Sequence, residues 1–305
     1  MSYTASDAIA RIKLKAWTGA SSSLTDAELL NLLNDALRSY VVPFLKAVRD
    51  EWFVSGYEEV TCDANARLTM PNSVASTIRT ISWTNNGQPT PLTRIEPEAA
   101  FAFEGNNGSS IPYGYVLRGY GIQILPTHVG SQTFQLRFME RPAEMVLEED
   151  AGQAAADGSG FTVTLSDTPL AWQSAAPATV DIVSNESPYS VLYEGVEVTS
   201  IVADVVTFTS FDATNIAEGM WLADPGASPY PNVPIELHPL LELDVMRTLF
   251  EGLGDKRLDG VVKRQMKMEG ELRKTLAPRT QGNARPLLNR TAPGANLGRW
   301  WAYGR

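Results

Sequence analysis

Residues 24–52 read LTDAELLNLLNDALRSYVVPFLKAVRDEW and carry the strongest local structural signal in the chain. Thr25 followed by Glu28 is the capping box that begins many helices, and Leu24 with Leu29 matches the hydrophobic staple around it. After this start, apolar residues recur at steps of three and four, which predicts a helix with one continuous apolar face. That face comprises Leu29, Leu33, Leu37, Tyr40, Phe44, Val48 and Trp52.

Pro43 interrupts this helical pattern. Proline has no backbone N–H, and its ring clashes with the carbonyl group four residues earlier, which belongs to Ser39. We therefore expect a kink or a restart of the helix at Pro43.

Helical patterns occupy both ends of the chain. The first helix is predicted to begin at Thr4 or Ser6 and to end near Trp17. Another begins near Glu236, where Pro239 is tolerated in the first turn. Its predicted core face contains Leu240, Leu241, Val245, Leu249 and Leu253.

A last helix is predicted from Asp255 to Leu276, with a basic outer side. Its inner side is predicted to contain Val261, Val262, Met266 and Leu272, and its outer side Lys263, Arg264, Lys267, Arg273 and Lys274.

From Gly56 to about Met145, apolar and polar residues alternate with the period of two that is typical of β-strands. Asn86-Gly87 and the stretch RGYG at 118–121 match hairpin turns, and Glu96–Phe103 is predicted as a short helix between strands. The predicted strands are Glu58–Cys62, Ala66–Met70, Thr77–Thr84, Pro89–Arg94, Gly114–Leu117, Gly121–Leu125 and Thr133–Phe138.

Residues 148–160, EEDAGQAAADGSG, are small and acidic, which predicts a linker. The alternation then resumes and predicts a second, smaller β unit that ends near Leu222. Its predicted strands are Phe161–Leu165, Thr179–Val183, Val191–Tyr193, Val196–Val202 and Val205–Thr209.

We therefore predict an α+β fold: an α-helical bundle built from the N- and C-terminal helices, with inserted antiparallel β domains and an extended C-terminal arm. Residues 1–55 and 235–276 supply the helices, 56–147 the β domain, 148–234 the inserted acidic β unit with its linkers, and 277–305 the arm.

Charge is distributed unevenly along the chain. Residues 1–260 hold 15 Lys and Arg against 33 Asp and Glu, whereas residues 261–305 hold 10 basic and 2 acidic residues. The net charge of −10 therefore combines an acidic body with a basic C-terminal end. Such a body repels nucleic acids and anionic membranes, whereas the basic end is suited to nucleic acid or to an acidic protein surface.

The arm, residues 277–305, reads APRTQGNARPLLNRTAPGANLGRWWAYGR and contains no acidic residue. Its prolines and glycines exclude a long helix or a regular strand. Arginine and aromatic side chains are the types most enriched at interface hot spots, so we expect the arm to order on a partner. The predicted contact residues are Arg279, Arg285, Leu287, Leu288, Arg290, Leu297, Arg299, Trp300, Trp301, Tyr303 and Arg305.

The sequence contains no enzyme signature. Its two histidines, His128 and His238, are far apart, and Cys62 is the only cysteine, so no zinc spacing occurs. Phosphate-binding, metalloprotease and serine-hydrolase motifs are missing too. We expect no enzyme, metal or cofactor, although a glycosidase pair among the 35 acidic residues stays open. Without a signal peptide or an apolar span, we expect a soluble chain made in the cytosol.

The chain resembles the head-to-tail connector, or adaptor, proteins of tailed bacteriophages. The resemblance rests on the helix at 24–54, on the helix start PNVPIELHPLLELDVMRTLFEGLGD at 231–255 with its following basic helix, and on the stretch RPLLNRTAPGANLGRWWAYGR at 285–305. The middle β segments depart from the smallest, purely helical members of that family.

The resemblance implies a structural protein of the virion neck, assembled in the host cytoplasm. Adaptors of this kind form a ring of twelve copies beneath the portal and continue the DNA channel, through which the genome passes, toward the tail. The helical part packs between neighbouring copies, here through Leu29, Leu33, Leu37, Tyr40, Phe44, Val48, Trp52, Leu241, Val245 and Leu249. The C-terminal arm inserts into the portal protein, and the β part faces outward or receives the tail or nozzle protein below.

Three alternatives stay open. In the first, the chain is another tail-ring, tail-terminator or receptor-side module that uses its β insertion. In the second, it is a nucleic-acid-binding protein that uses residues 261–305. In the third, it is an enzyme with a carboxylate pair in a cleft. Steeply salt-dependent binding of the isolated C-terminal peptide to DNA would favour the second alternative.

Overall fold

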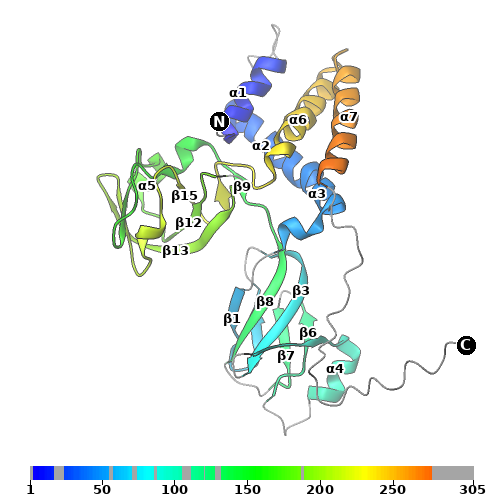
Figure 1. Cartoon of the computed structure of the whole chain (residues 1–305), viewed down its shortest axis with the longest axis vertical. Helices are drawn as coiled ribbons and strands as arrows, with labels where there is room; N and C mark the ends of the chain where they lie inside the picture. Colours follow the sequence, from blue (N-terminus) through cyan, green and yellow to red (C-terminus); the bar gives the residue numbers. More distant parts are fainter. Residues whose placement is uncertain are drawn as a thin grey trace, which may run out of the picture.

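The computed structural model describes residues 3–16, 24–54, 58–70, 74–85, 88–104, 111–119, 121–127, 132–186 and 189–276. The predicted arm, residues 277–305, lies outside the described residues. The fold is α+β, as predicted: N-terminal and C-terminal helices pack together, and antiparallel sheets are inserted between them (Figure 1).

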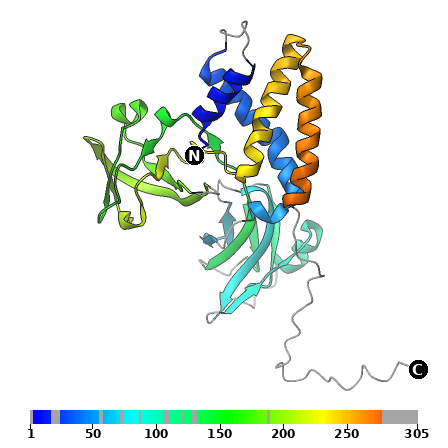
Figure 2. The same cartoon turned by 45° about the horizontal axis from the view of Figure 1, so that its top comes forward.

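The helical unit consists of α1 (Ala5–Ala16), α2 (Asp26–Ala36), α3 (Val42–Val48), α6 (His238–Leu253) and α7 (Leu258–Leu276). Helix α6 lies at its centre, because it packs against α1, α2 and α7 (Figure 2). The two ends of the chain therefore supply one core, in which Ile12, Leu33 and Leu241 are fully buried.

The predicted capping box begins α2. The hydroxyl of Thr25 accepts from the Glu28 backbone N–H at 3.3 Å, and the Glu28 carboxylate accepts from the Thr25 backbone N–H at 2.7 Å. Helix α1 likewise begins after Thr4, whose hydroxyl accepts from the Asp7 N–H at 3.2 Å. Both pairs satisfy backbone donors that a helix start leaves without partners.

Pro43 restarts the helix, as predicted, by way of a π-helical turn. The turn η1 (Leu37–Val41) joins α2 to α3, and the Val42 N–H bonds to the carbonyl of Leu37, five residues earlier. Pro43 occupies the first turn of α3, where its lack of an N–H is tolerated. A 3₁₀ turn, η2 (Asp50–Phe53), ends this segment.

The first β unit contains two four-stranded sheets, ordered β1-β8-β3-β4 and β2-β7-β6-β5, with β5 and β6 parallel and the other pairs antiparallel. Leu68, Ile81, Ile122, Phe134 and Phe138 fill the core of the unit. The strands are β1 (Glu58–Thr61), β2 (Arg67–Thr69), β3 (Val74–Asn85), β4 (Gln88–Pro91), β5 (Thr93–Arg94), β6 (Gly114–Arg118), β7 (Gly121–Leu125) and β8 (Thr133–Glu140), with α4 (Pro97–Glu104) before β6.

The second β unit is one six-stranded sheet, ordered β10-β15-β12-β13-β14-β11. Val180, Ile182, Val206 and Leu222 lie in its core. Its elements are β10 (Gly152–Gln153), β11 (Thr162–Thr164), α5 (Leu170–Ser174), β12 (Thr179–Val183), β13 (Val191–Val202), β14 (Val205–Phe208), η4 (Ala213–Asn215) and β15 (Trp221–Ala223).

Short elements connect the second β unit to the helices. Strands β9 (Glu144–Met145) and β16 (Ala227–Ser228) pair in parallel where the chain enters and leaves the unit. The side-chain amide of the buried Asn34 exchanges two hydrogen bonds with the Met145 backbone, at 2.9 and 2.8 Å, which fastens β9 to α2. The 3₁₀ turns η3 (Glu148–Asp150) and η5 (Ile235–Leu237) flank these strands.

Five sequence predictions are wrong. The predicted strand Pro89–Arg94 forms two strands, β4 and β5, which belong to different sheets. The predicted linker 148–160 contains β10, which pairs with β15, and Gly152 leaves room there for the side chain of Leu165. The predicted strands 191–193 and 196–202 form one strand, β13, with shifts of register. Leu253 and Met266, predicted on core faces, are 69% and 66% exposed, and Gln265 takes the inner position on α7.

Candidate functional site

The ten residues predicted to pack the helices lie in or against the core of a single chain. Leu29, Leu33, Leu37, Phe44, Leu241 and Val245 are buried there, and Tyr40, Val48, Trp52 and Leu249 are partly buried against it. These side chains hold one helical unit together. Packing of the helices between neighbouring copies stays a prediction.

A buried charge joins α1 to α6. The Glu242 side chain is 2% exposed, and its carboxylate accepts hydrogen bonds from the Tyr3 hydroxyl and the Lys15 ammonium group. The guanidinium of Arg11 lies 3.9 Å from the same carboxylate. Burial and the bond to Glu242 raise the pKa of the Tyr3 hydroxyl, which keeps it protonated as a donor. Removing one partner of a buried carboxylate is strongly destabilising, so this group fixes how the two helices pack.

His238, at the start of α6, is fully buried against Tyr3. Its Nε2 atom lies 3.2 Å from the carbonyl of Val233, and its ring centroid lies 4.4 Å from that of Tyr3. Its Nδ1 atom has no hydrogen-bond partner in the described part of the chain. Burial lowers the pKa of the imidazole to about 4, so it is neutral at physiological pH and acts as a core side chain. His128 lies outside the described residues.

A second polar group connects η1, α6 and α7. Gln265 on α7 donates from Nε2 to the Asp244 carboxylate at 3.1 Å, and Arg247 pairs with the same carboxylate at 2.8 Å. The Tyr40 hydroxyl donates to Glu269. Burial raises the pKa of Asp244, while Arg247 acts in the opposite direction. The inner face of α7 is thus partly polar.

A cleft of about 860 Å³ lies where the helical unit meets both β units. Glu58, Glu140 and Glu194 line it. The pKa values of Glu58 and Glu140 are raised by burial, and further by the charge of Glu194. Buried Asp181 accepts the backbone N–H groups of Gly195 and Gly226 at 2.7 and 2.6 Å, so its carboxylate has a structural role. Among the described residues, no group of His, Cys, Asp and Glu is arranged to hold a metal ion.

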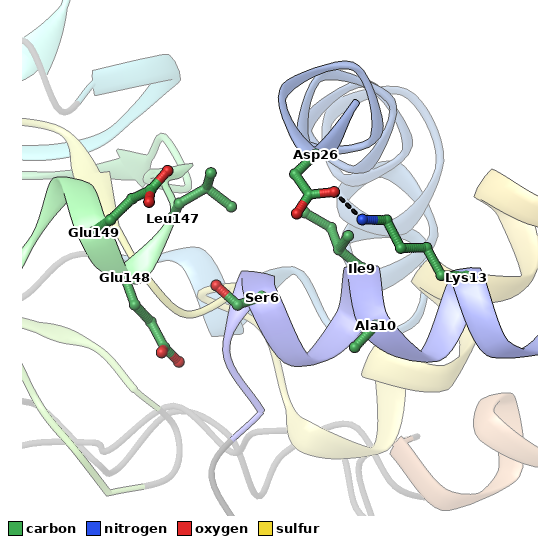
Figure 3. Close-up of a pocket in the computed structure, with 8 residues that line it drawn as sticks. All are labelled: Ser6, Ile9, Ala10, Lys13, Asp26, Leu147, Glu148 and Glu149. Atoms are coloured by element: carbon green, nitrogen blue, oxygen red, sulfur yellow. Dashed lines mark hydrogen bonds and ion pairs between the residues drawn. The ribbon is translucent and has the colours of Figure 1, made fainter. Parts of the chain in front are cut away.

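A smaller cavity of about 330 Å³ lies between α1, the start of α2 and residues 147–149 (Figure 3). Lys13 and Asp26 form an ion pair on one side of it, and Glu148 and Glu149 lie on the other. These residues form a charged groove but do not pair a nucleophile with a base.

The predicted contact residues of the arm, from Arg279 to Arg305, lie outside the described residues. Cys62 is buried, and its Sγ accepts the Gln132 N–H at 3.3 Å. Sequence reasoning missed Glu242, Asp244 and Gln265. For Glu242 and Asp244, the wide apolar stripe on α6 was the available signal. A helix with such a stripe is enclosed on most sides, so some of its polar residues are buried as well.

No protein-family model matches the chain, and no curated protein is similar enough to it to count as a relative. Within the described ranges, no helix combines the length and the hydropathy needed to cross a membrane.

Proposed function

We propose that the chain is a structural virion protein: a ring-forming adaptor that joins the portal vertex of the head to the tail and continues the DNA channel. In this proposal the C-terminal arm docks into the portal protein. The helical units stand side by side in the ring, and the β units face outward or contact the next tail component.

One observation carries this proposal most directly. Both ends of the chain build a single helical unit, and the two β units are inserted between them (Figure 1). The last helix of this unit, α7, ends at Leu276, so the 29 residues of the basic arm follow directly from the helical base. A base with a C-terminal extension is the arrangement expected of a protein that docks from one ring into another.

The composition of the arm is suited to docking. Fixing the backbone of one residue costs on the order of 1–2 kcal/mol, so a docking arm needs strong anchors to bind. Trp300 and Trp301 supply large apolar surfaces, and Arg299 lies directly before them. A ring multiplies such contacts, so that individually weak arms hold firmly together through avidity.

The anchors can be tested by comparing aromatic with basic substitutions. Replacing Trp300 and Trp301 together by alanine is expected to weaken binding to the portal protein of the same genome by about tenfold or more, because buried aromatic anchors dominate interfaces. Arg299→Ala, a single change at the residue directly before them, is expected to weaken binding to the portal protein less. The measurement is co-sedimentation with assembled portal rings across a range of adaptor concentrations. A larger effect of Arg299→Ala would identify the arm as an electrostatic tether and contradict the anchor assignment.

A further inference from the structure

The outer face of α7 is basic. Lys263, Lys267 and Lys274 are spaced so that they share one face of the helix, opposite the buried residues Gln265 and Leu272. All three are exposed, and none of them forms an ion pair within the described part of the chain. Met266 adds an exposed apolar side chain to the same face. Asp259 and Glu271 lie at the edges of this face, one turn from Lys263 and Lys267, so the face carries a net positive charge beside an exposed apolar side chain.

The second β unit has the opposite character. No lysine or arginine occurs between Arg141 and Arg247, whereas 13 acidic residues lie between Glu148 and Asp224. The carboxylates of Asp167, Glu186 and Glu197 are exposed, and within the described ranges they take part in no ion pair or side-chain hydrogen bond. The unit thus carries negative charge that this chain does not neutralise.

Apolar side chains also emerge from this acidic surface. Leu170 and Val202 are 80% and 68% exposed. The hydroxyl of Thr168 donates to the Asp204 carboxylate at 2.6 Å, and this bond joins the segment that contains Leu170 to the segment that contains Val202. Ala203 and Asp204 both have positive φ, at 49° and 64°. These two residues form the hairpin turn between β13 and β14, which requires positive φ at both positions and leaves Val202 beside the turn.

The two surfaces lie on opposite sides of the molecule. In both Figure 1 and Figure 2 the second β unit lies beyond α1, whereas α7 lies beyond α6 on the other side. Helix α6 contacts both α1 and α7, which places it between them. The basic and acidic surfaces therefore do not meet within one chain. When a surface and its complement lie on opposite sides of a molecule, they can meet only in a head-to-tail contact between two copies. Repeated contacts of this kind generate a ring if the rotation from one copy to the next closes.

We propose that the basic outer face of α7 in one copy docks on the acidic second β unit of the next copy. This inference rests on the proposed ring function and names the surfaces that join the copies. It places the second β unit between neighbouring helical units, so that only the first β unit is left to face outward or toward the next tail component. A second copy is favoured over DNA as the occupant for two reasons. Its complementary surface is present at equal concentration, and both surfaces include exposed apolar side chains, which a phosphate backbone does not match.

Charge reversal tests this contact. One variant combines Lys263→Glu, Lys267→Glu and Lys274→Glu, and a second combines Asp167→Lys, Glu186→Lys and Glu197→Lys. Each full-length variant alone is expected to self-associate at least about tenfold more weakly than the wild type, because like charges then face each other. In an equimolar mixture the variants are expected to recover association, since alternating copies make every contact complementary. Sedimentation velocity at low salt measures all four samples, and circular dichroism verifies that each variant is folded.

Several outcomes would overturn the inference: a wild type that does not associate, variants that associate as the wild type does, or a mixture that does not recover. If the α7 variant loses binding to DNA, and the mixture of variants does not recover self-association, this face binds nucleic acid instead. The assay contains no portal protein, so its failure is distinct from failure of the proposed function. If the mixture recovers but the wild type does not bind the portal, the contact stands and the adaptor role fails.

Discussion

The free energy of unfolding is expected to fall by about 3 kcal/mol through His238 alone as the pH decreases from 6.5 to 4. The imidazole is buried in the native state with its pKa lowered to about 4, whereas in the unfolded chain it titrates near 6.5. Between these values the unfolded state binds a proton that the native state excludes. Stability contributed by the neutral imidazole is therefore complete above pH 6.5 and is lost as the pH falls toward 4.

A non-titrating variant isolates this effect. His238→Gln keeps a side-chain donor for the Val233 carbonyl but removes the titration, so its stability is expected to depend less on pH than that of the wild type. Acids such as the half-buried Glu140 and the buried Asp244, whose pKa values are raised, act in the opposite direction and cancel in the comparison. Urea unfolding followed by circular dichroism across this pH range gives the difference. Parallel curves for the two proteins, or an imidazole that titrates near 6.5 by NMR, would contradict the prediction.

Leu241→Ala is expected to destabilise the helical unit by about 2–5 kcal/mol, because it leaves a cavity in a core that relaxes only partly. Leu241 is fully buried near the start of α6, in the core that the N-terminal and C-terminal helices share. The same helix offers a matched control in Leu253, which is 69% exposed. Leu253→Ala is expected to change the free energy of unfolding by no more than about 0.5 kcal/mol.

Urea unfolding of both leucine variants measures the difference directly. Equal effects would mean that Leu241 and Leu253 lie in similar environments, contrary to their positions on α6. A small effect at Leu241 alone would mean that the two ends of the chain do not share one core.

The sequence predicted those features of the fold that depend on local chemistry. The capping box of Thr25 and Glu28, the restart at Pro43 and the first-turn position of Pro239 each follow from backbone groups within a few residues. Most strands of both β units were also predicted, and in strands such as β2, β8 and β14 buried residues alternate with more exposed ones. The meeting of the terminal helices followed from the order of the elements along the chain.

Features that depend on distant parts of the chain were not predicted. Asn34 has an ordinary helical context in the sequence, yet it is buried because it binds the backbone of Met145. Glu242 is buried because Tyr3 and Lys15 reach it from the other end of the chain. The exposed positions of Leu253 and Met266 depend on where α6 and α7 meet their neighbours, which helical periodicity alone does not specify. The docking function of the arm rests on its composition and stays a proposal.

The most direct test of the adaptor proposal is co-sedimentation with the portal protein of the same genome. The full chain is compared with a chain that ends at Leu276, the last residue of α7. The truncation leaves every described element in place, and circular dichroism verifies that the helical unit is folded. The proposal predicts that the full chain sediments with the portal and that the truncated chain stays in solution. If neither chain binds the portal, or both bind it equally well, the arm is not the docking element and the account is contradicted.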